Sequence, residues 1–122
     1  MLVPADSVNV AAMSVGWETS ERGDGYLVEL SGELDISSAA SVESRLMELE
    51  KREPKRLILD LTRVCFIDST GLSMIINADG RARKRGSRLT IVSGEGVPRR
   101  ILRTVGLEDR LDVISEPPAA GS

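Results

Sequence analysis

The sequence predicts a single α/β domain built on a mixed sheet of four or five strands, with helices packed against it. Residues 57–61 are almost continuously apolar, which is typical of a central strand covered on both faces. Strand and helix patterns then alternate along the chain, and this order calls for right-handed crossovers between parallel strands. The length of 122 residues, of which 41% are hydrophobic, suits one domain with a single core.

The first two strands are predicted to pair as an antiparallel hairpin at one edge of the sheet. An Asp-Gly pair at residues 24–25 separates two strand-forming runs and favours a tight turn. We expect this hairpin to add an antiparallel edge to the parallel strands that follow. The predicted strands are residues 17–20, 26–30, 57–61, 88–92 and 111–114.

Three helices are predicted between these strands, from capping residues and from apolar side chains at helical spacing. A turn over residues 32–35 precedes the first helix, and a loop over residues 62–67 precedes the second. Gly86 stands where a glycine commonly ends a helix. The predicted helices run from Ser37 or Ser38 to about Arg52, from Asp68 to about Arg85, and from Pro98 to Gly106.

The composition indicates the boundaries of the domain and its compartment. We expect a flexible N-terminal arm over residues 1–16, a folded domain over residues 17–114 and a disordered tail over residues 115–122. No run of 18 apolar residues and no basic segment before an apolar run is present, so we expect neither a membrane span nor a signal peptide. With Cys65 as the single cysteine, a cytoplasmic protein is predicted.

The composition also argues against several classes of function. The sequence holds no histidine, which removes the base of Ser-His-Asp and Cys-His catalysis and the commonest metal ligand. A net charge of −3 and only three aromatic residues argue against a dedicated nucleic-acid-binding protein. We therefore expect a protein that is not an enzyme and that carries no cofactor.

The candidate site lies where two predicted strands meet the helices that follow them. In an open α/β sheet, functional residues gather at the carboxyl ends of the strands. Asp35, Asp68 and Ser69 would share that edge if their strands are neighbours. Ser69 is predicted at the first helical position, where free backbone amides and the helix dipole favour a phosphate. The alternative is that Ser69 and Thr70 are ordinary first-turn residues, since serine and threonine are common at helix starts.

Other candidate sites have structural alternatives. Asp35 and Asp60 form a candidate Mg²⁺ pair, but coordination of that ion asks for more than two scattered carboxylates, and a role in holding loop amides is favoured. Five basic residues over positions 81–88 either attract an acidic partner or complement the end of a helix. Ser69 lacks the G-x-S-x-G context and the base that a catalytic serine requires.

Four motifs stand in order along the chain: Leu30-Ser31-Gly32-Glu33-Leu34-Asp35, Leu57 to Leu61 with Asp60, Phe66-Ile67-Asp68-Ser69-Thr70-Gly71-Leu72, and Val105-Gly106-Leu107. In order and spacing they resemble the STAS family, and within it the bacterial anti-sigma factor antagonists. The resemblance covers about residues 17–114. The resemblance implies a single STAS-like domain of mixed sheet and helices.

The same resemblance implies a regulator that works by partner switching. The antagonist binds an anti-sigma factor that is also a serine kinase, releases a sigma factor, is switched off by phosphorylation and is reset by a serine phosphatase. The serine that matches the phosphorylated position is Ser69, with Thr70 as the less favoured acceptor. The implied partner-binding residues are Gly32, Glu33, Asp35, Asp68, Ser69, Thr70, Gly71 and Leu72.

The resemblance also implies an alternative function and an expected oligomeric state. Related STAS domains serve as accessory subunits of lipid-transport or stressosome assemblies, which is the alternative function. A monomer or a weak dimer is expected, without direct contact to nucleic acid. ATP would belong to the kinase and not to this chain.

Overall fold

A computed structural model describes residues 15–118 of the chain. Within them, five strands form one sheet in the order β1-β2-β3-β4-β5. The β1–β2 hairpin is antiparallel, and every later pair of neighbouring strands is parallel. The elements are β1 (Val15–Arg22), β2 (Gly25–Leu34), α2 (Ala39–Glu50), β3 (Arg56–Ile67), α3 (Ser69–Lys84), β4 (Arg88–Val92), α4 (Val97–Thr104) and β5 (Asp112–Ile114).

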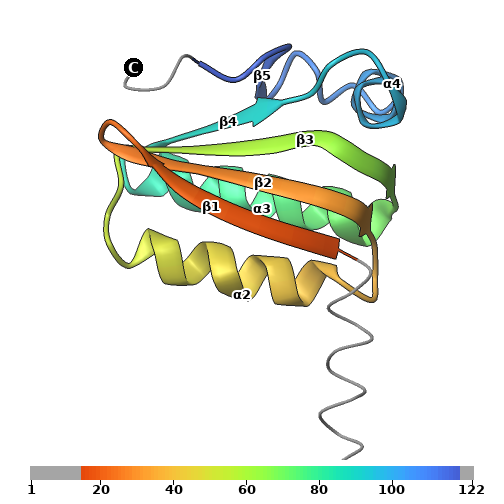
Figure 1. Cartoon of the computed structure of the whole chain (residues 1–122). Helices are drawn as coiled ribbons and strands as arrows, with labels where there is room; N and C mark the ends of the chain where they lie inside the picture. The colour runs from red at the N-terminus through yellow and green to blue at the C-terminus, as the bar shows by residue number, and fades with distance from the viewer. Residues whose placement is uncertain (1–14, 119–122) are drawn as a thin grey trace, which may run out of the picture.

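The predicted class, element order and antiparallel edge are therefore confirmed. Figure 1 shows α2 and α3 side by side beneath the sheet, with α4 farther along, near the right-hand end of β3. The pairing of β3 with β4 stops at Asp60 and Val92, and α4 packs against β3. On the edge away from β2, the long strand β3 thus pairs with β4 along its first half and contacts α4 farther on.

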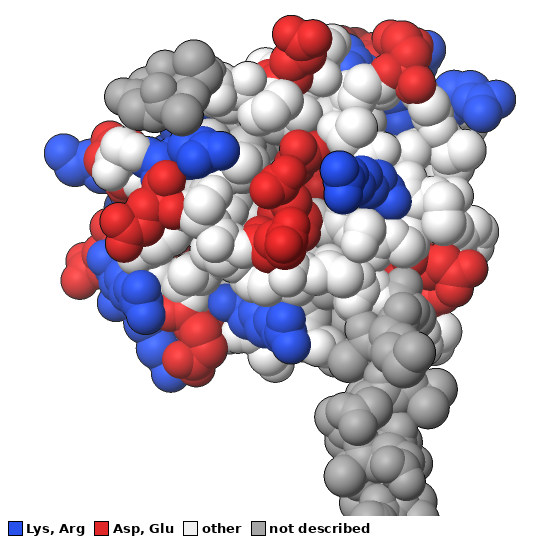
Figure 2. Space-filling view, in the orientation of Figure 1, with Lys and Arg blue, Asp and Glu red and all other residues white. Residues whose placement is uncertain are grey.

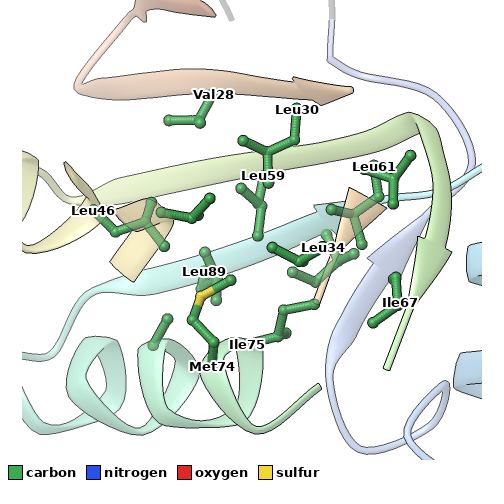
Figure 3. Close-up of a cluster of buried hydrophobic side chains, with 14 of the residues drawn as sticks. Val28, Leu30, Leu34, Leu46, Leu59, Leu61, Ile67, Met74, Ile75 and Leu89 are labelled. Atoms are coloured by element: carbon green, nitrogen blue, oxygen red, sulfur yellow. The ribbon is translucent and has the colours of Figure 1, made fainter. Parts of the chain in front are cut away.

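The main core lies between the sheet and its helices, and α4 contributes Leu102 to it. Figure 3 shows aliphatic side chains of β2 and β3 meeting side chains of α3, among them Leu30, Leu59 and Ile75, each at most 1% exposed. A smaller cluster of Leu27, Ile58 and Val92 occupies the opposite face of the sheet. Because both faces of the central strands are buried, their apolar runs are nearly continuous, as the sequence predicted.

Two predicted loops are in fact strand. The chain over residues 62–67 belongs to β3, and Gly32–Leu34, predicted as part of a turn, belongs to β2. The register between β2 and β3 shifts twice, between Glu29 and Ser31 and again between Gly32 and Glu33. Each shift leaves one extra residue on β3, which breaks the two-residue alternation that reveals a strand in a sequence. The prediction of loops was wrong because a bulged strand lacks this alternation and its sequence resembles that of a loop.

The helix and domain boundaries differ from the prediction by a few residues. The first two helices end at Glu50 and Lys84, earlier than predicted, and α4 begins at Val97, one residue before Pro98. The predicted N-terminal arm lies outside the described residues except for Val15 and Gly16, which begin β1. Residues 115–118 of the predicted tail carry no helix or strand, and residues 119–122 lie outside the described part.

An ionic cluster joins the two helices beneath the sheet. The Glu50 side chain of α2 is 9% exposed and accepts hydrogen bonds from Arg81 Nε at 2.8 Å and Arg81 Nη2 at 3.1 Å. Arg81 Nη1 reaches Glu43 at 2.8 Å, and Arg85 lies 3.3 Å from Glu50. Removal of one partner from such a cluster leaves a charge with little access to water.

The basic segment over residues 81–88 is largely engaged in such pairs. Besides Arg81 and Arg85, Arg83 pairs with Asp79 and Arg88 pairs with Asp112. Four of its five cations therefore have carboxylate partners within the described residues. The structural interpretation of this segment is favoured over a patch for an acidic partner.

We expect Glu50→Ala to lower the free energy of unfolding by about 2–3 kcal/mol, because Arg81 and Arg85 lose their shared carboxylate. Glu48→Ala is the matched control, since the Glu48–Lys51 pair is exposed and should contribute less than about 0.5 kcal/mol. Urea denaturation followed by circular dichroism measures both. Equal midpoints for the two variants would contradict the proposed role of the cluster.

Candidate functional site

The predicted site residues meet at one end of the sheet. β2 and β3 are parallel neighbours whose last residues, Leu34 and Ile67, are paired, so the loops that follow them emerge together. The amide of Ile36 donates to Asp68 Oδ2 at 3.0 Å, and the amide of Asp68 donates to the Leu34 carbonyl at 3.3 Å. The predicted common edge for Asp35, Asp68 and Ser69 is therefore confirmed.

Asp68 is the N-cap of α3, as the sequence predicted. Its backbone is extended, and its Oδ1 accepts a hydrogen bond from the Gly71 amide at 2.9 Å. The second carboxylate oxygen is the one that holds Ile36. One side chain thus fixes both the start of the helix and the position of the neighbouring loop.

Gly71 lies where β2 and α3 come closest. A Cβ atom at this position would clash with the backbone carbonyl of Leu34 and would crowd the Ile67 side chain. The glycine is buried in the first turn of α3, at a position where alanine would otherwise favour the helix. A side chain at this point would push the helix start away from β2, so the glycine serves close packing.

Asp35 organises the loop between β2 and α2. Its Oδ1 accepts hydrogen bonds from the Ser37 hydroxyl at 2.6 Å and the Ser37 amide at 3.0 Å. These bonds, the hydroxyl bond above all, lower the pKa of Asp35 below its ordinary value of 3.8. Ser38 is the N-cap residue of α2, but its buried hydroxyl donates to the Glu33 carbonyl and makes no cap bond to the helix.

Ser69 is the exposed residue at the first position of α3. Within the described residues, the amides of Ser69 and Thr70 have no hydrogen-bond partner, and neither do the two hydroxyls. Those amides point out of the helix N-terminus, where a negative group is stabilised by the helix dipole. The arrangement leaves the Ser69 oxygen accessible and places two donors where a phosphate would use them.

The other candidate groups are occupied by local structure. Asp60 is 8% exposed, and its Oδ1 accepts a hydrogen bond from the Thr62 amide at 2.9 Å. This bond is the favoured structural alternative to a role as a magnesium ligand.

Among residues 15–118, no three His, Cys, Asp or Glu side chains group as metal ligands would. In that same range, no helix is long and apolar enough to span a bilayer.

The predicted partner-binding residues are not equally accessible. Glu33 and Ser69 are exposed, Gly32, Asp35, Asp68, Thr70 and Leu72 are half-buried, and Gly71 is buried.

Two apolar side chains beside these residues were not among the predicted site residues. Ile36 is 77% exposed and Phe66 is 46% exposed. Phe66 stands in the segment that the sequence predicted as a loop, and a loop gives a side chain no predictable direction. Only the register of the bulged β3 places it opposite Glu33, at the rim of the site.

Comparison with known proteins gives one family, whose relatives include anti-sigma-B factor antagonists and a putative sulfate transporter of Bacillus subtilis, which is 32% identical over 67% of this chain and 15% of that protein. The STAS domain model matches residues 16–119. An anti-sigma-B factor antagonist of Listeria monocytogenes is 29% identical over 102 residues, which cover 83% of this chain and 90% of the relative.

Solved structures share the fold at lower identity. An anti-sigma factor antagonist from Mycobacterium paratuberculosis superposes with a TM-score of 0.77 at 22% identity, covering 84% of this chain and 87% of the other. Unphosphorylated SpoIIAA, an anti-sigma factor antagonist, gives a TM-score of 0.71 at 14% identity, covering 84% and 89%. The phosphorylated form of SpoIIAA from Bacillus gives 0.66 at 14% identity, covering 84% and 92%. At these identities the likeness establishes the fold alone.

We expect Gly71→Ala to lower the free energy of unfolding by at least about 2 kcal/mol, because the added methyl group meets the Leu34 carbonyl. Gly80→Ala, in the same helix but with open space around the added atom, should raise stability by about 0.5–1 kcal/mol. Thermal and urea unfolding of both variants test this contrast. A similar change in both would show that only helix propensity matters at position 71.

The Asp35 carboxylate should titrate below its ordinary pKa of 3.8, and Ser37→Ala should move that pKa upward, since the Ser37 hydroxyl is the largest cause of the shift. Because the folded-state pKa is the lower one, the stabilisation from Asp35 is present above the unfolded-state pKa and is lost as the pH falls through the folded value. Carbon-detected NMR titration of the carboxyl groups measures both variants. An unchanged pKa in Ser37→Ala would contradict the assignment.

Proposed function

The chain belongs to the STAS domain family, and from that premise we propose that it is an anti-sigma factor antagonist switched at Ser69. In its unphosphorylated form it binds an anti-sigma factor that is also a serine kinase, and this binding releases a sigma factor. Phosphorylation of Ser69 by the kinase ends the complex, and a serine phosphatase restores the antagonist. The protein itself acts without catalysis and without a cofactor.

The exposed hydroxyl of Ser69 at the start of α3 is the observation that carries this proposal. A kinase must reach the acceptor oxygen, and Ser69 is exposed whereas Thr70 is half-buried. This difference supports Ser69 as the acceptor and Thr70 as the less favoured one. The residues around it supply a surface of mixed polarity, made of Glu33, Asp35, Asp68 and Leu72.

The local geometry supports a switch that changes the surface and leaves the fold intact. A phosphate on Ser69 would add about −1.5 to −2 charges at pH 7. The amides of Ser69 and Thr70 are available to it, and both Asp68 oxygens already hold other amides. The added charge would therefore be tolerated by the helix and met by any partner that docks there.

The relatives support the class of partner. The Listeria monocytogenes relative is named an anti-sigma-B factor antagonist and matches most of both chains. SpoIIAA, which has the same fold, exists in a phosphorylated form. We therefore place the partner of this chain among anti-sigma factors and propose phosphorylation as the means of release.

Purified chain is to be incubated with ATP and each candidate serine kinase of the anti-sigma class encoded in the same genome, and the phosphate mapped by mass spectrometry. We expect one phosphate, on Ser69, with one of these kinases. Phosphate on neither Ser69 nor Thr70 with any of them would overturn the proposed switch. Capture of membrane transport subunits in place of a soluble kinase would favour the alternative of an accessory subunit.

Ser69→Ala should bind the anti-sigma factor as tightly as the unmodified chain but should resist release by ATP. Ser69→Asp should weaken binding by about ten-fold or more, yet less than phosphorylation does, because aspartate supplies only one negative charge. Ser44→Asp, at an exposed serine of α2, is the matched control and should change binding little. Titration calorimetry measures all three, and equal affinities for Ser69→Asp and Ser44→Asp would count against the site.

A further inference from the structure

Exposed apolar side chains gather at the end of the molecule that carries Ser69. Six large hydrophobic side chains are exposed among the described residues, and four belong to elements at this end. Ile36 and Phe66 flank the site at 77% and 46% exposure, and Val97 and Val105 of the α4 region are 37% and 51% exposed. Figure 2 shows largely uncharged surface at the right-hand end of the molecule, with charged side chains around it.

The structure of α4 explains why its apolar residues face outward. Val97, Ile101 and Val105 recur every four residues and line one shallow hollow of about 270 Å³ together with Arg100 and Thr104. The opposite side of the helix is already satisfied, because Pro98 and Leu102 are buried against the rest of the fold. The side of the helix that carries Val97 and Val105 is therefore apolar and exposed, and Ile101 between them is partly buried against the core.

The position of α4 places this stripe at the same end of the molecule as the Ser69 site. α4 packs against β3, whose pairing with β4 ends at Asp60. The far half of β3 carries Phe66 and leads directly to Asp68 and Ser69. Figure 1 shows α4 above that end of β3, with the start of α3 below it.

The charges on α4 favour a protein over a lipid surface as the occupant. Arg99 and Arg103 are paired with Glu108, which leaves Arg100 as the cation of this helix without a carboxylate partner among residues 15–118. A single cation contributes too little attraction to anionic lipid for stable binding by a two-turn helix. An apolar stripe with one free guanidinium instead fits a protein surface that offers an apolar anchor beside one carboxylate.

We propose that the stripe of Val97, Ile101 and Val105, with Arg100 at its edge, is a second part of the anti-sigma factor docking surface. This proposal rests on the proposed function. The stripe supplies binding area that phosphorylation does not alter, whereas Ser69 supplies the switch. The partner accordingly contacts α4 with apolar side chains and meets Arg100 with a carboxylate.

The test compares Val105→Glu with Met47→Glu, each placing a charge at a side chain of similar exposure, 51% and 46%. Circular dichroism first confirms that both variants are folded. Calorimetry with the anti-sigma kinase that phosphorylates Ser69 should then show about ten-fold weaker binding for Val105→Glu and no change for Met47→Glu. Arg100→Glu should also weaken binding, and it should reduce the salt dependence of the affinity.

Each outcome decides the proposal. Unchanged affinity of Val105→Glu, with Ser69→Asp still weakened, would overturn the α4 surface and leave the proposed function standing. Failure of the unmodified chain to bind any kinase of the panel would overturn both. If Val105→Glu instead abolishes sedimentation with phosphatidylglycerol vesicles while kinase binding is unchanged, the stripe is a membrane contact and the proposal is wrong.

Discussion

The two oxygens of the Asp68 carboxylate hold together the two loops at the end of the sheet that carries Ser69. One accepts the Gly71 amide inside α3, and the other accepts the Ile36 amide in the loop after β2. Each bond alone would contribute on the order of 1 kcal/mol, but together they fix two loops relative to each other. The close contact of Gly71 with the Leu34 carbonyl completes the arrangement, because α3 can begin this near to β2 only without a side chain. The exposed position of Ser69 follows from that start.

The sequence was informative wherever a residue's role depends on its nearest neighbours. Asp68 as an N-cap, Ser69 at the first helical position and Gly86 beyond the helix end with a φ of 69° all follow from local rules. The continuous apolar run at residues 57–61 predicted the central strand because burial on both faces removes alternation. The common edge of Asp35 and Asp68 followed from topology, since parallel neighbours end together.

What the sequence did not reveal depends on contacts between distant segments. The bulges in β3 exist because β2 and β3 must stay paired while β3 gains two residues, and no local pattern marks such a mismatch. The outward direction of Phe66 depends on that register. The apolar spacing over residues 98–106 predicted a helix there, and Leu102 is indeed buried, yet Val97 and Val105 remain exposed because only one side of the helix packs against β3. The pairing of Glu50 with Arg81 likewise needed the packing of α2 against α3.

The position of Ser69 also bears on how a switch can operate without unfolding the domain. A charge introduced where the backbone is fully paired would compete with existing hydrogen bonds and cost stability. At the start of α3 the competition is small, since Asp68 already serves Gly71 and Ile36 while the amides of Ser69 and Thr70 face outward. A phosphate there would act mainly on whatever covers the surface. Its repulsion would then oppose docking energy gained elsewhere, so a second contact on α4 would let the affinity and the switch vary independently of each other.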